Sequence, residues 1–262
     1  MSATHDDAKK LVRTQVWDAL DAAGAVHDDT AHGRIPNFKG SEEAAARLAG
    51  LEAWKNATVI KAVPDKAQLP VRARALEDGK LLYMAVPKLA TPKPFYLLDP
   101  DVLEVPPHEA ASSRVAATIA PTVEVDALRP ISVVVLGSVA VNRSGVRIGK
   151  GAGYSDLEFA LLTEAGLVGP ETLVVTTVHP LQVIETPIPS TEHDVNVDVI
   201  ITPDEVITCS TPHRPPGILW DHLEASKIAA IPALQSRVQA AAGAVASELI
   251  LEWTRLNEAK HR

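Results

Sequence analysis

The sequence has one cysteine, Cys209, and therefore cannot form an intramolecular disulfide. This fits a reducing compartment such as the cytoplasm. The first residues show neither a basic start followed by an apolar stretch nor the composition of a transit peptide. No apolar run approaches the roughly 18 residues that a membrane helix requires. We therefore expect a soluble cytoplasmic protein with no membrane partner.

Aromatic residues and positive charge are also scarce. Aromatics make up 4% of the chain while hydrophobic residues make up 46%, so the core must consist mainly of Ala, Val, Leu and Ile. The formal net charge of −8 argues against a nucleic-acid partner, because counterion release on a polyanion requires a basic face. A basic pocket inside an acidic protein is still compatible with this composition, and a phosphate site requires such a pocket.

Strands alternate with helices after a helical start, which predicts a three-layer α/β/α fold with a mostly parallel central sheet. The clearest strand is 131–137, whose run of β-branched residues is typical of a strand buried on both faces. The expected helices span 8–23, 41–51, 70–77 and 157–165. The expected strands span 58–63, 80–86, 131–137, 171–178, 197–202 and 205–208.

Two proline-rich stretches interrupt this pattern. Residues 90–130 predict mostly loop, with one short strand near 95–98. Residues 212–217 form a second break, after which the chain is Ala-rich and mostly helical. We expect an α/β domain at 1–210 and a helical C-terminal extension at 211–262 that packs on the same domain.

The segment 147–156, RIGKGAGYSD, carries glycines at alternate positions: Gly149, Gly151 and Gly153. Glycine permits positive φ angles and a close approach of backbone amides to a ligand. Successive amides form an anion-binding concavity, and a helix that begins near Asp156 adds its N-terminal partial charge. The flanking Arg147 and Lys150 suit phosphate oxygens, and Asp156 suits Mg²⁺.

Taken alone, G-x-G-x-G fits a flexible turn as well as a binding loop. It is neither the dinucleotide motif G-x-G-x-x-G nor the Walker motif with its lysine. Similarly, Lys9 and Arg13 in the first helix alone fit a solvated helix face. Residue types and spacing therefore predict an anion-binding loop and no specific ligand.

Four segments, in order along the chain, match the motifs of one known family. Residues 8–13 resemble its N-terminal K-x-x-x-R helix, and residues 78–87 its G-K-x-x-x-x-P strand. Residues 147–156 are similar to R-x-G-x-G-x-G-Y-Y-D, with Ser155 in place of the second tyrosine. Gln182-Val183 with 193–198 resembles Q-[VL] and H-D-[VI]-x-[VL]-D. The chain resembles the 5-formyltetrahydrofolate cyclo-ligases, also called 5,10-methenyltetrahydrofolate synthetases.

Members of that family use ATP and Mg²⁺ to phosphorylate the formyl oxygen of 5-formyltetrahydrofolate, which then cyclises to 5,10-methenyltetrahydrofolate with release of ADP and phosphate. The resemblance implies ATP and Mg²⁺ as cofactors and a reduced folate as substrate. It also implies catalytic roles for Arg147, Lys150 and Tyr154 and a metal contact for Asp156. The implied nucleotide-binding residues are Lys9, Arg13, Arg147, Gly149, Lys150, Gly151, Ala152, Gly153 and Tyr154. Such cations and amides suit phosphoryl transfer, which is catalysed mainly by positioning and charge neutralisation.

Three positions depart from the family pattern on the folate side. Ala67 stands where the family has a folate-binding glutamate, although Asp65 is nearby. Ser155 replaces an aromatic residue, and Leu157 stands where many members carry arginine. The phosphate half of the predicted site is intact and the folate half is altered. This resembles a divergent branch with a V-P-D stretch and a P-x-G-I-x-W extension, here residues 215–220.

Three functions follow from this pattern. The first is the cyclo-ligase reaction on 5-formyltetrahydrofolate. The second is an ATP-using reaction on another small substrate, such as an N-formyl, pterin- or thiamine-related compound. The third is a non-catalytic nucleotide-binding protein. The intact phosphate cations favour the first two, whereas Ala67 favours the second or third.

Other polar residues have simpler interpretations. His179 and His193 lack the H-x-x-x-H or C-x-x-C spacing of a metal site, so structural hydrogen bonds are the favoured interpretation. Cys209 has no recognisable nucleophile context and is expected to be a buried or semi-buried thiol. Ser138 follows a strand but lacks the second glycine of a nucleophile elbow.

Overall fold

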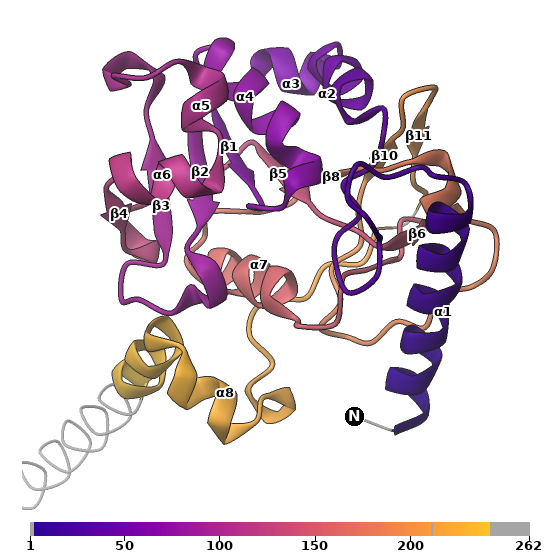
Figure 1. The fold of residues 1–262 in the computed structure, drawn as a ribbon. Coiled ribbons are helices and arrows are strands. Elements are labelled where there is room, and N and C mark those ends of the chain that lie inside the picture. The colour runs from indigo at the N-terminus through magenta and orange to yellow at the C-terminus, as the bar shows by residue number, and fades with distance from the viewer. Residues whose placement is uncertain (1–2, 211, 242–262) are drawn as a thin grey trace, which may run out of the picture.

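The computed structural model describes residues 3–210 and 212–241 of the 262-residue chain. Its centre is an eight-stranded sheet with the strand order β11-β10-β8-β5-β1-β2-β3-β4 (Figure 1). Five neighbouring strands, from β10 to β2, run parallel, and the strands at both edges pair antiparallel. The strands of this sheet are β1 Val59–Ala62, β2 Leu81–Ala85, β3 Phe95–Leu98, β4 Thr122–Val123, β5 Val133–Leu136, β8 Leu173–Thr177, β10 Val199–Ile201 and β11 Val206–Thr208.

Helices cover both faces of the sheet, which confirms the three-layer α/β/α prediction. Helices α2 and α4 pack on one face, and α7 packs on the other (Figure 1). The helices are α1 Ala3–Ala22, α2 Ser41–Ala49, α3 Glu52–Asn56, α4 Leu69–Glu77, α5 Pro107–Ala110, α6 Ser113–Ile119, α7 Tyr154–Glu164 and α8 Ala225–Ala230.

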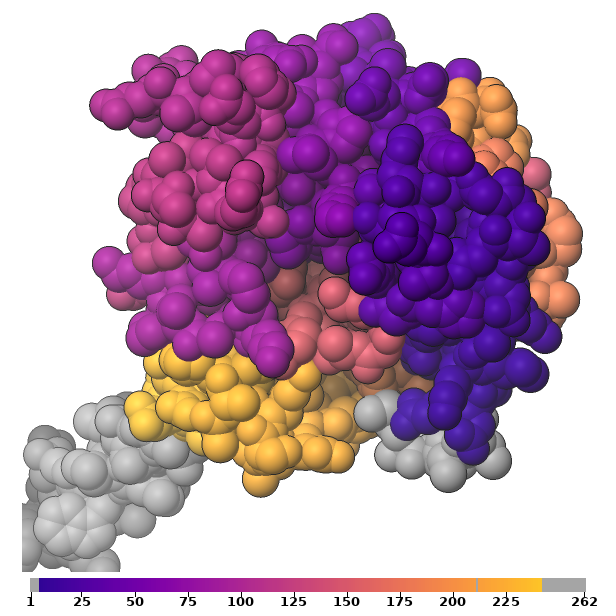
Figure 2. All heavy atoms as spheres, viewed as in Figure 1, coloured from indigo at the N-terminus to yellow at the C-terminus, as the bar shows by residue number. Residues whose placement is uncertain are grey.

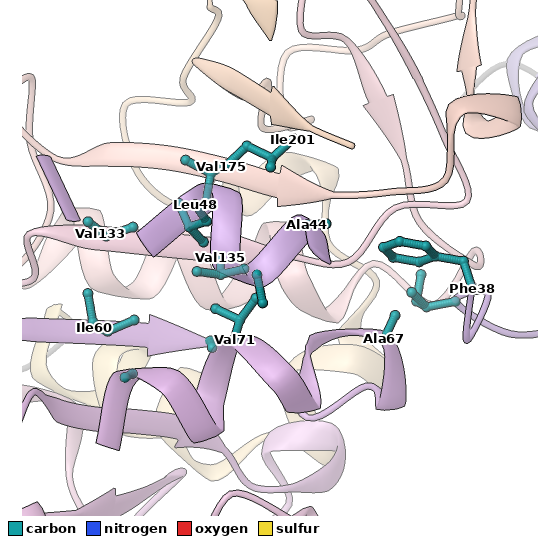
Figure 3. Packing of buried hydrophobic residues seen from close by; sticks show 14 of the residues in the cluster. Phe38, Ala44, Leu48, Ile60, Ala67, Val71, Val133, Val135, Val175 and Ile201 are labelled. Atoms are coloured by element: carbon teal, nitrogen blue, oxygen red, sulfur yellow. The ribbon is translucent and has the colours of Figure 1, made fainter. Parts of the chain in front are cut away.

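Strand β5 shows how the sequence divides the core. Val133 and Val135 belong to the core under α2 and α4, whereas Val134 and Leu136 belong to the core under α7. All four side chains are buried. This follows from the alternation of side chains along a strand, and it explains why a continuous apolar run is needed at the centre of a parallel sheet. Figure 3 shows the first of these cores, with Leu48 lying near the strand residues.

Two regions differ from the sequence-based expectation. Helices α5 and α6 and strand β4 lie within 90–130, which the prolines predict to be mostly loop. Pro107 is compatible with α5 because proline is tolerated at the first position of a helix. A second, three-stranded sheet was also not predicted, and its strands are β6 Ala140–Asn142, β7 Arg147–Ile148 and β9 Val183–Ile184.

Residues 218–241 pack on the α7 side of the sheet. They form the 3-10 helix η6 (Trp220–His222), α8 and a further helix over 232–241. Ile231 and Leu234 are fully buried in the same core as α7. The predicted helical character is confirmed for the described part, while 211 and 242–262 lie outside the described residues. The division of the chain at residue 210 stays a prediction.

Among the described residues, no helix combines the length and apolar character needed to cross a membrane. The cytoplasmic location stays a prediction.

Candidate functional site

A cavity of about 730 Å³ opens at the carboxyl edge of the parallel strands. Its lining includes Val63 to Asp65 after β1, Ala85 to Pro87 at the end of β2, and Gly137 after β5. Strands β1 and β5 are neighbours. The next strand of this sheet after β1, β2, lies toward one edge, and the next after β5, β8, lies toward the other edge. Ligands of open α/β sheets bind at such a switch point. Figure 2 shows the hollow, bordered by the indigo N-terminal part and the yellow C-terminal part of the chain.

The glycine loop forms one wall of this cavity and leads directly into α7. Gly151 and Gly153 have φ angles of 107° and 69°, which other residues rarely adopt. Gly153 is the N-cap of α7, so the helix begins at Tyr154, earlier than predicted, and Asp156 lies in its first turn. The first N–H groups of a helix have no partner within the helix and carry a positive partial charge. They lie beside the cavity, where they suit an anion.

Arg147 lies beneath the loop, held by the β6–β7 hairpin. Its side chain is 1% exposed, with Nη1 donating to the Gly137 carbonyl at 3.2 Å and Nη2 to Asp156 Oδ1 at 3.0 Å. Asp156 Oδ1 also accepts from the Val195 amide at 3.1 Å. In the described part of the chain, the buried Nε of Arg147 has no partner. Arg147 thus links Asp156 to the backbone that follows β5, and its contact with a phosphate stays a prediction.

The structure tests the fit of Asp156 to Mg²⁺ in one respect. No group of three or more His, Cys, Asp or Glu residues that could hold a metal ion occurs within the described ranges. Mg²⁺ commonly takes only one or two carboxylates and completes its shell with water and substrate phosphates. Asp156 beside the glycine loop fits that arrangement, and its metal contact stays a prediction.

The first helix brings two cations to the cavity. Lys9 is buried, and its Nζ donates to Asp194 Oδ2 at 2.5 Å. Arg13 Nε donates to the Gly149 carbonyl at 2.7 Å. Burial lowers the pKa of Arg13, and the carboxylates of Asp6 and Asp194 oppose that shift. Three of the separated motifs therefore meet here, namely the first helix, the glycine loop and the segment at 193–198.

The acidic residue on the folate side of the cavity is not at the position that the family pattern implies. Ala67 lies in the 3-10 helix η1 (Lys66–Gln68) and is buried in the core under α2 and α4. A carboxylate at this position would therefore enter the core and not the cavity. Asp65 lines the cavity instead, with its Oδ1 3.7 Å from Lys150 Nζ. Ser155 and Leu157 both line the cavity, as their place in the loop predicts.

The C-terminal segment supplies a wall that the sequence did not predict. Lys227 Nζ donates to the Ala152 carbonyl at 3.0 Å and lies 3.7 Å from the centroid of the Tyr154 ring. His222 faces His193, with their Nδ1 atoms 3.4 Å apart. No local sequence pattern distinguishes Lys227 from other lysines in predicted helices.

A buried ion pair lies at the floor of the cavity. Lys61 of β1 donates to Glu158 of α7, with side chains that are 1% and 6% exposed. Glu158 also lines the cavity. A lysine inside an otherwise apolar strand was the available sequence signal, because a lysine is rarely fully buried unless it is paired.

The remaining polar candidates lie outside the cavity lining. His179 caps the 3-10 helix η5 (Pro180–Gln182), its Nδ1 accepting from the Leu181 amide at 3.1 Å, and burial lowers its pKa against the effect of Asp204. Cys209 is a buried thiol whose pKa is raised to about 11 by burial and by Asp198. Ser138 is buried and hydrogen-bonded to Thr176 at 2.8 Å. These contacts agree with the structural roles expected from the sequence.

Comparison with known proteins places the chain in a family. Residues 5–203 match the 5-formyltetrahydrofolate cyclo-ligase family. The chain is 38% and 37% identical, over 238 residues, to methenyltetrahydrofolate synthase domain-containing proteins of Bos taurus and Mus musculus. These alignments cover 87% of this chain and 61% and 63% of the relatives, so the chain spans about three-fifths of their length.

The fold has a solved counterpart as well. It is similar to the NMR structure of Aquifex aeolicus 5,10-methenyltetrahydrofolate synthetase, with a TM-score of 0.50 and 20% sequence identity. The match covers 84% of this chain and 99% of the other. At this identity the likeness concerns the fold, and the family match over most of the chain is independent of it. The chain belongs to the 5-formyltetrahydrofolate cyclo-ligase family.

Proposed function

We propose that the chain is an ATP- and Mg²⁺-dependent enzyme that converts 5-formyltetrahydrofolate to 5,10-methenyltetrahydrofolate through a phosphorylated formyl intermediate. The observation that carries this proposal is the convergence of Lys9, Arg13 and Lys150 on the glycine loop at the N-terminus of α7. These groups offer positive charge and N–H donors to the transferred phosphoryl group. Phosphoryl transfer requires mainly such positioning and charge neutralisation.

The rest of the cavity supports a ring-shaped substrate. Val63, Val86, Leu157 and Leu223 provide apolar surface, and the carboxylate of Asp65 faces the same space. Apolar walls with a few directed acceptors suit the faces and N–H edges of a reduced pterin. Bound at this place, the formyl group would lie beside the phosphate half of the site, and closure around it would exclude water from the phosphorylated intermediate.

A second candidate is an ATP-using reaction on a different small substrate, pterin- or thiamine-related. The substitutions Ser155 and Leu157 favour it, because both line the cavity on the substrate side. A non-catalytic nucleotide-binding role would keep the phosphate half alone.

Formation of 5,10-methenyltetrahydrofolate, followed by absorbance with ATP and Mg²⁺, tests the first proposal. We expect product formation that depends on ATP. Tight ATP binding by calorimetry without product, beside an active cyclo-ligase control, would exclude the folate reaction and leave the other candidates. Phosphate release with other substrates would then separate those two.

Lys150→Ala tests the position of the phosphate site. Its side chain is 48% exposed, so the substitution should leave folding intact. We expect ATP affinity to fall by about 10-fold or more, as for loss of a charge-assisted hydrogen bond. Lys10→Ala, at an exposed lysine of α1, is the matched control. Equal affinity of both variants would place the phosphates elsewhere.

A further inference from the structure

Two cations from distant parts of the sequence donate to carbonyls of the glycine loop. Arg13 of α1 donates to the Gly149 carbonyl at 2.7 Å, and Lys227 of α8 donates to the Ala152 carbonyl at 3.0 Å. Lys9, Arg147 and Lys150 each have a carboxylate within 4.0 Å. Within the described ranges, neither Arg13 nor Lys227 has one. The loop thus contacts two positive charges that have no carboxylate within 4.0 Å, although Asp6 and Asp194 act on Arg13 from further away.

The position of the Lys227 ammonium is fixed by two contacts. It lies 3.7 Å from the centroid of the Tyr154 ring, a cation–π geometry, and one of its N–H groups goes to Ala152. An ammonium has three donors, so two remain for a ligand. Ala152 lies between Gly151 and Gly153, whose positive φ angles shape the loop. The free donors therefore lie where the loop meets the cavity, which Lys227 itself lines.

The positive charges at this loop repel one another, while the carboxylates of Asp6 and Asp194 attract Arg13 from beyond 4.0 Å. Arg13, Lys227 and the N-terminus of α7 are all positive and lie at one loop, and a cation near a helix N-terminus is destabilising. An anion bound among them would convert this repulsion into attraction. A phosphate has oxygens for several donors at once, and a lysine is a compact charge that can adjust to them.

We propose that Lys227 binds phosphate oxygens of the nucleotide at the glycine loop, as the counterpart of Arg13. Lys227 lies outside the family-matched segment 5–203, so the C-terminal segment forms part of the nucleotide site of this chain. The inference rests on the proposed function, since it takes a nucleoside polyphosphate as the ligand. It adds to that function a residue and a chain segment that complete the site.

Calorimetric titration of the full chain with ATP, ADP and adenosine tests this inference. We expect Lys227→Met to weaken ATP binding by about 10-fold or more. The loss of ADP affinity should be no larger than the loss of ATP affinity, and the affinity for adenosine should not change. Lys227→Arg should retain most of the affinity because it keeps the charge. Lys10→Met removes an exposed lysine outside the cavity and should bind ATP as the unmodified chain does.

Lys227→Gln separates charge from anchoring, because it keeps a donor for the Ala152 carbonyl and loses the charge. Affinity equal to that of the unmodified chain in this variant would overturn the inference and leave the proposed function standing. Unchanged ATP binding in Lys227→Met, or an equal loss for ATP and adenosine, would do the same. If the unmodified chain binds no ATP, the proposed function fails and the inference with it. Thermal unfolding without ligand checks that each variant is folded.

Discussion

Asp194 joins the first helix to the segment that precedes β10. Its carboxylate accepts from Lys9, and from the amide and hydroxyl of Thr191 at 2.7 and 2.9 Å. Burial raises the pKa of Asp194, but the hydrogen bonds and charge of Lys9, together with Thr191, outweigh it and hold the pKa below its ordinary value of 3.8. Because folding lowers this pKa, the carboxylate contributes stability above the unfolded value and loses it as the pH falls through the folded value.

We expect Asp194→Asn to lower the free energy of unfolding at pH 7, because the buried Lys9 loses its charged partner. The difference between the variant and the unmodified chain should shrink as the pH falls below 3.8. Urea denaturation over a pH series measures it, with Asp29→Asn at an exposed aspartate as the control for the change of charge. A difference that stays constant down to low pH would contradict this role of Asp194.

Gly151 is the loop residue with the least tolerance for a side chain. Its φ of 107° is unfavourable for alanine, and an added Cβ would lie 3.5 Å from the Arg13 guanidinium carbon. We expect Gly151→Ala to lower stability by about 1–3 kcal/mol and to weaken ATP binding by displacing the loop. Gly166→Ala is the matched control, since Gly166 also has a positive φ but has open space around it and lies outside the cavity lining. Similar ATP affinities in calorimetry would show that the loop conformation is not required.

Between elements, the Lys61–Glu158 pair connects β1 to α7 across the core. Removal of one partner leaves an uncompensated buried charge, whereas replacement of both by apolar groups is often tolerated. We expect Lys61→Met to lower the free energy of unfolding by about 3–5 kcal/mol. The double variant Lys61→Met with Glu158→Leu should recover much of this loss in urea denaturation at pH 7. A double variant less stable than Lys61→Met would contradict an uncompensated charge on Glu158 as the cause of the loss.

Elements with a repeated local pattern could be predicted from the sequence. Helix α2 has Glu42 and Glu43 in its first turn, and β5 is a run of apolar residues, so each carries its own evidence. Strand β7 has two residues and no periodicity. The β6–β7 hairpin that contains it depends on a close approach between its turn and a segment distant in the sequence. A Cβ on Gly145 would lie 2.3 Å from the Val197 carbonyl, a contact between distant segments.

The site was predictable to the extent that its residues lie in motifs. The loop and the two cations of α1 were identified through the family resemblance, and the structure brings them together. Spacing along the chain matches Ala67 to the family glutamate because it does not show the η1 turn, which directs Asp65 toward the cavity and Ala67 toward the core. Lys227 reaches the loop only through packing of the C-terminal segment, which no local pattern shows.

In the whole molecule, the C-terminal segment is part of the core and not an appendage. Leu234 is fully buried beside residues of α7. We expect Leu234→Ala to lower the free energy of unfolding by about 2–5 kcal/mol, through lost burial and the cavity left behind. Leu11→Ala, at a leucine of α1 that is 59% exposed, should change it by less than about 0.5 kcal/mol. Denaturant unfolding compares the two, and equal small effects would mean that the segment packs only loosely.

The contacts of Arg13 and Lys227 with the glycine loop also affect when the site is completed during synthesis of the protein. Arg13 and Lys227 contact the same short loop but are far apart in the sequence. A nascent chain that has been synthesised as far as α7 contains Arg13 and the glycine loop. It lacks the cavity wall that Lys227 supplies until residue 227 has left the ribosome. A ligand that contacts both walls therefore stabilises completed chains by mass action and leaves interrupted ones unprotected against proteolysis.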